Sequence, residues 1–214
     1  READANRLIG KNVNFVVIAA SAWIAFCLLC AKPVILILGG SDFSEAATPL
    51  ILASPSVAFS ALNIAFAGYL MSHSREREWA VINVIGLILA AIYNSVLIPR
   101  FGVQGSAIGV TLTELSVLVL RASRCGGLVK EVWRQAEVHK VLLSICLAYA
   151  VSLLASMIFS EMGSIQQILV LGVILCITYI LLLLVLKDKF VMSYYLRITG
   201  KKHARSTHEG GSIK

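Results

Sequence analysis

The chain contains six long apolar runs, separated by short segments that carry most of its charges. Each run is close to the roughly 20 residues that a helix needs to cross about 30 Å of hydrocarbon. None alternates apolar with polar residues over 9–11 positions, as membrane β-strands do. The pattern predicts an all-α integral membrane protein, a bundle of six transmembrane helices over Val13–Ala31, Pro49–Met71, Trp79–Ile98, Gly105–Ser123, Val141–Phe159 and Ile165–Leu186.

Composition supports a membrane environment. Apolar residues make up 58% of the chain and charged residues only 14%, against roughly 45–50% and about 25% in soluble domains. The formal net charge of +7 raises the possibility of nucleic-acid binding. We exclude that class because the basic residues lie between apolar runs rather than on one polar face.

The distribution of basic residues predicts the topology. All of them except Lys32 and Arg100 precede the first run, lie between the second and third, flank the connection between the fourth and fifth, or follow the sixth. Lysine and arginine are enriched on the cytoplasmic side of membrane proteins. We therefore expect both termini to be cytoplasmic and the protein to lie in the plasma (inner) membrane.

Four segments are expected along the chain. Residues 1–12 form a cytoplasmic N-terminal segment, and residues 13–186 form the membrane domain. Residues 187–200 place aromatic and aliphatic side chains on one helical face beside basic residues, which is typical of a helix lying on a membrane surface. Residues 201–214 form a basic tail without fixed structure. Because the chain opens on Arg1, we expect it to be a piece of a longer protein.

Glu114 is the one charged residue deep inside a predicted span. A carboxylate is costly in hydrocarbon, so it should face protein or a water-filled cavity. One interpretation makes it a proton, cation or substrate site. The other makes it a helix-linking group that bonds to Thr111, Thr113 or Ser116. Arg121 lies about two turns closer to the cytoplasm, so we expect no cation at the depth of Glu114.

The third run carries the polar residues Asn83, Tyr93 and Asn94. Asn83 and Asn94 are eleven residues apart, close to three helical turns, and therefore share a helix face. That face either lines a hydrophilic cavity or provides hydrogen bonds between helices.

A turn is expected between the third and fourth runs, where Pro99 ends one helix and Gly102 follows. Gly105 and Gly109 are one turn apart, a spacing that permits close helix packing. Arg100, at the outer interface, is expected either to extend to lipid phosphates or to bind an anionic head group.

No catalytic constellation is apparent. All four histidines lie in predicted loops or the tail, and Cys27-x-x-Cys30 lacks a second ligand pair. We expect no enzyme activity, no cofactor and no bound metal.

Several motifs resemble those of polysaccharide flippases. Residues 94–109, Asn-Ser-Val-Leu-Ile-Pro-Arg-Phe-Gly-Val-Gln-Gly-Ser-Ala-Ile-Gly, are similar to that family's N-x-x-L-I-P-x-[FY]-G-[IV]-x-G-A-A-I-[AG]. Thr111–Glu114 resembles the T-x-[IL]-[ST]-E that follows. Residues 37–47 resemble L-[FY]-G-x-x-[FY]-x-x-A with an extra glycine, and residues 70–75 resemble its basic cytoplasmic turn.

The resemblance, over Val13–Leu186, is to the C-terminal part of a Wzx-type flippase of the MOP superfamily. It implies a missing N-terminal lobe and a lipid-linked oligosaccharide, carried on undecaprenyl pyrophosphate, that crosses the membrane by alternating access. The residues implied along a substrate or ion pathway are Glu114, Asn83, Asn94, Tyr93 and Arg100. Two alternatives remain: a cation-coupled small-molecule exporter with Glu114 as the coupling residue, and a non-transporting scaffold subunit.

Overall fold

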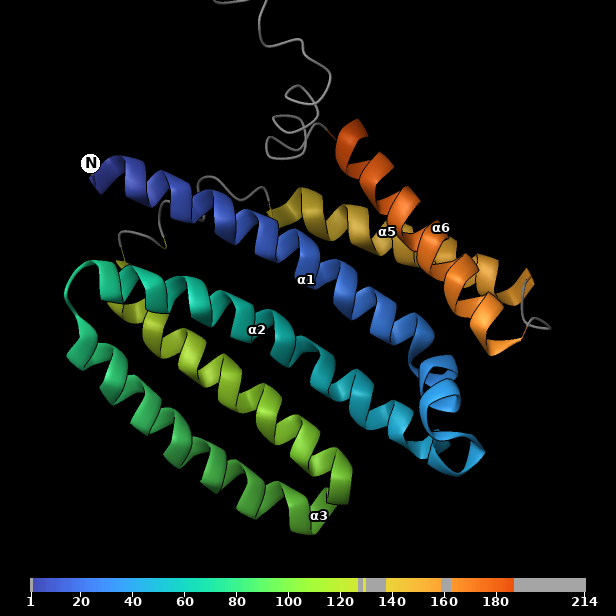
Figure 1. Ribbon diagram of the computed structural model, residues 1–214, viewed down its shortest axis with the longest axis horizontal. Coiled ribbons are helices and arrows are strands. Elements are labelled where there is room, and N and C mark those ends of the chain that lie inside the picture. Colours follow the sequence, from blue (N-terminus) through green and yellow to red (C-terminus); the bar gives the residue numbers. More distant parts are fainter. Residues whose placement is uncertain (1, 127–128, 130–137, 159–162, 187–214) are drawn as a thin grey trace, which may run out of the picture.

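A computed structural model describes residues 2–126, 129, 138–158 and 163–186. Within these ranges the chain is helical and contains no strand. The elements, shown in Figure 1, are α1 (Glu2–Gly39), the short 3₁₀ helix η1 (Ser41–Ala46), α2 (Ala47–Ser72), α3 (Glu76–Arg124), α5 (Val138–Ile158) and α6 (Ser164–Val185).

Five described helices are long and apolar enough to cross a membrane, rather than the six predicted. The all-α membrane class is therefore confirmed, and the number of separate helices differs. The difference lies in α3, whose 49 residues contain both the third and the fourth predicted runs. The large apolar side chains on its outer surface, such as Leu87 at 72% exposed, suit contact with lipid.

α3 is a helical hairpin. Gly102 has φ 57° and ψ −133°, which breaks the helix, and the ribbon of α3 turns back on itself in Figure 1. A residue with a side chain rarely adopts this positive φ, so the predicted turn falls on a suitable residue. Beyond the turn the two limbs of α3 (residues 76–101 and 103–124) are antiparallel, since Tyr93 contacts Ser116.

Glycines allow the two limbs to approach closely, as predicted. A Cβ on Gly105 would collide with the backbone carbonyl of Leu97, and one on Gly109 would lie 2.8 Å from Asn94 Oδ1. At the other end of the hairpin, a Cβ on Gly86 would lie 2.7 Å from Val117. The small residues thus lie where the limbs cross.

α1 is longer than predicted. It continues past Ala31 to Gly39, and it begins at Glu2, so the backbone of residues 2–12 is helical. Pro33 lies inside the helix, a position that membrane helices tolerate, and the exposed Lys32 has solvent or headgroups within reach. Neither residue ends the helix, although both interrupt the apolar run.

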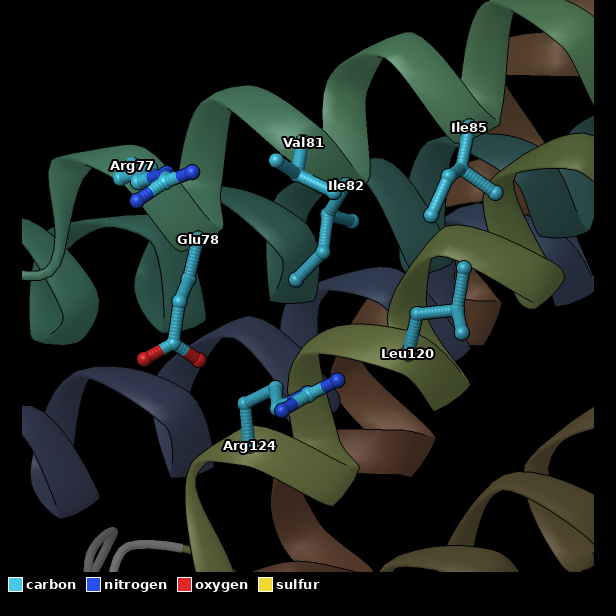
Figure 2. Close-up of a pocket in the computed structure, with 7 residues that line it drawn as sticks. All are labelled: Arg77, Glu78, Val81, Ile82, Ile85, Leu120 and Arg124. Carbon is cyan, nitrogen blue, oxygen red and sulfur yellow. The ribbon is translucent and has the colours of Figure 1, made fainter.

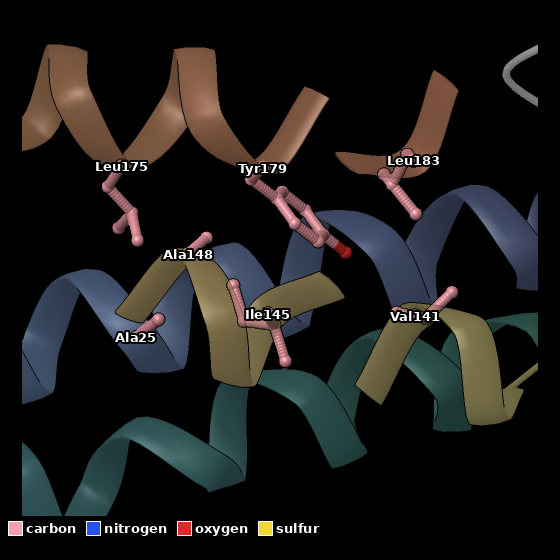
Figure 3. Packing of buried hydrophobic residues seen from close by; sticks show 7 residues of the cluster. All are labelled: Ala25, Val141, Ile145, Ala148, Leu175, Tyr179 and Leu183. Atoms are coloured by element: carbon pink, nitrogen blue, oxygen red, sulfur yellow. The ribbon is translucent and has the colours of Figure 1, made fainter. Parts of the chain in front are cut away.

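α1 lies between two pairs of neighbours, the α2–α3 unit on one side and α5 with α6 on the other (Figure 1). Figure 3 shows the core between α1, α5 and α6, where seven side chains point toward one another: Ala25, Val141, Ile145, Ala148, Leu175, Tyr179 and Leu183. A second cluster joins α2 to α3 through Phe66, Leu70, Ile82 and Val117, with Cys125 beside them.

Pro55 lies inside α2 without ending it. Proline has no amide hydrogen, so the carbonyl of Ile51, four residues earlier, loses its usual partner. The Ser54 hydroxyl donates to that carbonyl at 2.8 Å. At the next carbonyl along α2, that of Leu52, the Thr111 hydroxyl of α3 donates a hydrogen bond of 2.8 Å. Side-chain hydroxyls therefore supply hydrogen bonds around the proline.

The predicted interfacial helix at 187–200, the predicted tail at 201–214 and most of the basic segment between the fourth and fifth runs lie outside the described residues.

Candidate functional site

A polar network connects α2 to both limbs of α3, with Asn63 and Arg121 buried and Glu114 and Asn83 half-buried. Its first member is Asn63 of α2, which is 3% exposed. The Asn63 side-chain amide donates to the Glu114 carboxylate Oε2 at 2.8 Å and to the Glu114 backbone carbonyl at 3.0 Å. Glu114 is thus held by a residue from a different helix, rather than by the neighbouring hydroxyls that the sequence suggested.

Arg121 is the second charged member. Its side chain is 7% exposed. One guanidinium nitrogen, Nη1, donates to the Asn63 backbone carbonyl at 2.9 Å, and the other, Nη2, donates to Asn83 Oδ1 at 2.7 Å. Arg121 lies about two turns from Glu114 along α3, as expected, but Asn63 bonds to both residues and so links them.

The network carries one positive and one negative charge, linked through Asn63 rather than by direct contact. Within the described residues the only ion pair between side chains is that of Arg75 with Glu78. Buried charges are tolerable in low-dielectric surroundings when they are compensated and hydrogen-bonded. Asn63 Oδ1 and Arg121 Nε have no hydrogen-bond partner, so the network keeps one acceptor and one donor for further bonding.

Of the residues predicted from sequence, the structure brings Glu114 and Asn83 into the network. Tyr93 lies elsewhere on the hairpin, where its hydroxyl is 3.0 Å from Ser116 Oγ. Asn94 donates to the Ala90 carbonyl of its own helix at 2.8 Å and lies against Gly109. Arg100 is exposed beside the Gly102 turn and takes no part.

Asn63 was not among the residues predicted from sequence, and Arg121 was interpreted only as one of the basic residues that mark the cytoplasmic side. A signal for Asn63 was present, since it is the one side-chain amide in the second apolar run. Arg121 lies near the end of the fourth run, where a flanking basic residue is ordinary. Its burial depends on α2, which is distant in sequence.

At one end of the α2–α3 unit, the turn between these helices is fixed by Arg75. Its guanidinium makes two bonds of 2.7 Å to the Glu78 carboxylate and one of 2.8 Å to the Arg124 carbonyl. The Glu78 hydrogen bond raises the pKa of Arg75 above its usual value. Arg75, Arg77 and Arg124 therefore lie at the same end of the hairpin, opposite Arg100.

Metal ligation has no candidate in this part of the chain. Among the residues that the structure describes, no three His, Cys, Asp or Glu side chains come together in a way that would hold an ion. Cys27 and Cys30 are buried free thiols on α1.

Comparisons with known families, with curated proteins and with solved structures gave no match. The function is therefore inferred from the residues of this chain.

Proposed function

We propose that this chain is one lobe of a membrane transporter that moves a lipid-linked oligosaccharide, carried on undecaprenyl pyrophosphate, across the plasma (inner) membrane. In this proposal both limbs of α3 cross the bilayer, which gives six crossings with both ends of the chain in the cytoplasm. The second lobe is the N-terminal part that the motif resemblance implies.

The observation that supports transport best is the buried network of Asn63, Glu114, Arg121 and Asn83. Ionisable side chains inside membrane bundles are rare and usually mark substrate or ion pathways. Glu114 is also the last residue of the segment Thr111–Glu114, which resembles the T-x-[IL]-[ST]-E motif. A simple membrane anchor or scaffold has no need of a buried arginine linked to a half-buried glutamate.

The network suits a rigid lobe better than a coupling site. Alternating access requires one lobe to rock against the other as a body, and the network ties α2 to both limbs of α3. The Arg121 guanidinium already donates hydrogen bonds to two acceptors, the Asn63 carbonyl and Asn83 Oδ1. In this proposal the cations that offset the pyrophosphate charge come mainly from the second lobe.

A flipping assay tests the function. The complete protein that contains this chain is reconstituted in liposomes with a fluorescent undecaprenyl-pyrophosphate oligosaccharide, and an impermeant lectin measures transfer between leaflets. We expect transfer well above that of protein-free liposomes. Folded protein that gives no transfer, yet expels a cationic dye when a proton or sodium gradient is applied, would replace this proposal with the exporter.

Glu114→Gln separates the two roles of Glu114. Glutamine keeps the shape and can still accept a hydrogen bond from Asn63, so we expect flipping within about twofold of wild type in the same assay, since one neutral hydrogen bond replaces a charge-assisted one. Glu114→Leu, which cannot accept that bond, is the matched control and should lower the yield of folded protein. Normal folding of Glu114→Gln with complete loss of flipping would instead assign proton or cation coupling to Glu114.

A further inference from the structure

An open groove of about 180 Å³ runs between the two limbs of α3 at the end that carries the basic residues. Figure 2 shows that its side chains come from the start of the first limb and the end of the second. Arg77, Glu78 and Arg124 lie toward one end, and Val81, Ile85 and Leu120 continue along it. The groove is thus charged at one end and apolar beyond.

The charged end has an excess of positive charge. Glu78 is already neutralised by Arg75, which binds both of its carboxylate oxygens at 2.7 Å. The guanidinium groups of Arg77 and Arg124 make no hydrogen bond or ion pair with any residue that the structure describes, and both side chains are exposed. Arg77 and Arg124 line the groove from opposite limbs of α3, with Glu78 between them, and guanidinium groups donate paired hydrogen bonds to phosphates.

The apolar part of the groove is open to the surroundings of the bundle. Val81 is 51% exposed and Ile85 is 37% exposed. Both lie within a helix long and apolar enough to cross a membrane, so the medium beside them is hydrocarbon. A basic site at the end of a membrane helix, continuous with an apolar slot, has the same order of polarity as a phospholipid, with the phosphate above and acyl chains below.

We propose that this groove binds one glycerophospholipid with an anionic head group, independently of the transport function proposed above. The phosphate pairs with Arg77 and Arg124, and an acyl chain lies along Val81, Ile85 and Leu120. A zwitterionic lipid presents the same phosphate together with a cation, which the two arginines repel. The groove therefore selects lipids by net charge.

Photo-crosslinking tests the site. The full chain is placed in nanodiscs with phosphatidylglycerol or phosphatidylcholine that carries a diazirine in one acyl chain, and mass spectrometry counts label on residues 81–85 and 120. We expect roughly tenfold more label from phosphatidylglycerol, a preference on the order of that from two basic residues near an anionic lipid. Arg77→Gln/Arg124→Gln should bring the ratio close to one.

Two further variants control for charge and folding. Lys32→Gln/Arg100→Gln removes the same number of positive charges elsewhere on the molecule and should leave the ratio unchanged. Val81→Trp keeps both arginines and fills the slot, so labelling by either lipid should fall severalfold. Equal labelling by the two lipids in wild type would overturn the proposal. A labelling ratio that stays unchanged in the double arginine variant would also overturn it. If that variant does not fold, undiminished labelling in Val81→Trp would overturn it instead.

Discussion

The α2–α3 unit and the group formed by α1, α5 and α6 are held together by different interactions. Between α2 and α3, charged and amide side chains make buried hydrogen bonds of 2.7–3.0 Å. Among α1, α5 and α6, the long-range side-chain bonds between described residues include those of the Tyr179 hydroxyl with Ser21, at 2.8 Å, and with the Ile18 carbonyl, at 3.3 Å. The first region combines these polar contacts with an apolar cluster, whereas apolar packing dominates the second.

Lipid explains why this difference matters. Lipid tails are as apolar as leucine side chains, so helices in a membrane gain little from burying apolar surface against one another. The α1–α5–α6 group compensates with small residues at its contacts, including Ala25 and Ala148, which are 3% and 0% exposed. Close packing permits several similar arrangements, whereas the hydrogen bonds of Arg121 and Asn63 fit only one. We infer that the α2–α3 unit has the more sharply defined geometry.

Loss of Arg121 should have the largest effect. Arg121→Met removes the guanidinium that donates to the Asn63 carbonyl and to Asn83 Oδ1, and each lost hydrogen bond to a charged group typically costs about 1.5–3 kcal/mol. We expect a large fall in the unfolding free energy, measured in detergent by denaturant titration.

A double-mutant cycle supplies the control. Glu114→Gln removes the remaining charge, so the combination with Arg121→Met should cost about 1–2 kcal/mol less than the sum of the single changes, which is the scale of coupling in one network. Additive effects would show that Glu114 and Arg121 are not energetically linked through Asn63.

Gly105→Ala should have the next largest effect. The added methyl group would collide with the Leu97 carbonyl, and the limbs of α3 must separate to admit it, at about 1–3 kcal/mol. The same denaturant titration measures the loss. Gly68→Ala in α2 is the matched control because a Cβ there meets nothing within 4 Å. Equal stability of the two variants would contradict the close crossing of the limbs.

The parts of this fold that the sequence predicts are those that depend on neighbours in the chain. Hydropathy identifies the apolar helices, and Gly102 identifies the turn of the hairpin. Pro99, which was expected to end the first limb, lies inside the helix instead, and the break comes only at Gly102. The network depends instead on residues about 50 positions apart, such as Asn63 and Glu114, which no local pattern relates. For the same reason the sequence alone does not distinguish Arg121 from an ordinary flanking residue, because its burial depends on contact with α2.

Tyr179→Phe should have a smaller effect, because it removes hydroxyl bonds from a region that depends on packing. Hydrogen bonds between membrane helices contribute about 0.6 kcal/mol on average, and we expect a loss of that order in thermal unfolding monitored by circular dichroism. Ser144→Ala, which removes a buried hydroxyl without a partner, should be neutral within about 0.5 kcal/mol. A loss above about 2 kcal/mol for Tyr179→Phe would mean that this region also depends on polar contacts.

The smallest expected effect concerns the chemical reactivity of Cys125. Burial raises the pKa of its thiol, so less thiolate is present at any pH, and thiolate is the reactive form. Two variants are compared: one that keeps Cys125 as its only cysteine, and Gly126→Cys in a cysteine-free background. Maleimide should label Cys125 more slowly, and the labelling rate of Cys125 should begin to rise only at a higher pH than that of the cysteine at position 126. Equal rates at pH 7 would indicate that the end of α3 opens readily.

The separation of Asn63 from its partners has a consequence for biosynthesis. α2 leaves the ribosome 51 residues before Glu114 does, and Arg121 emerges later still. During that interval Asn63 is a side-chain amide in an otherwise apolar helix, with none of its final hydrogen bonds. The α3 hairpin can pair its own limbs through Tyr93 and Ser116 as soon as both have emerged. Newly made α2 is therefore the segment most exposed to membrane quality-control proteases until the hairpin docks against it.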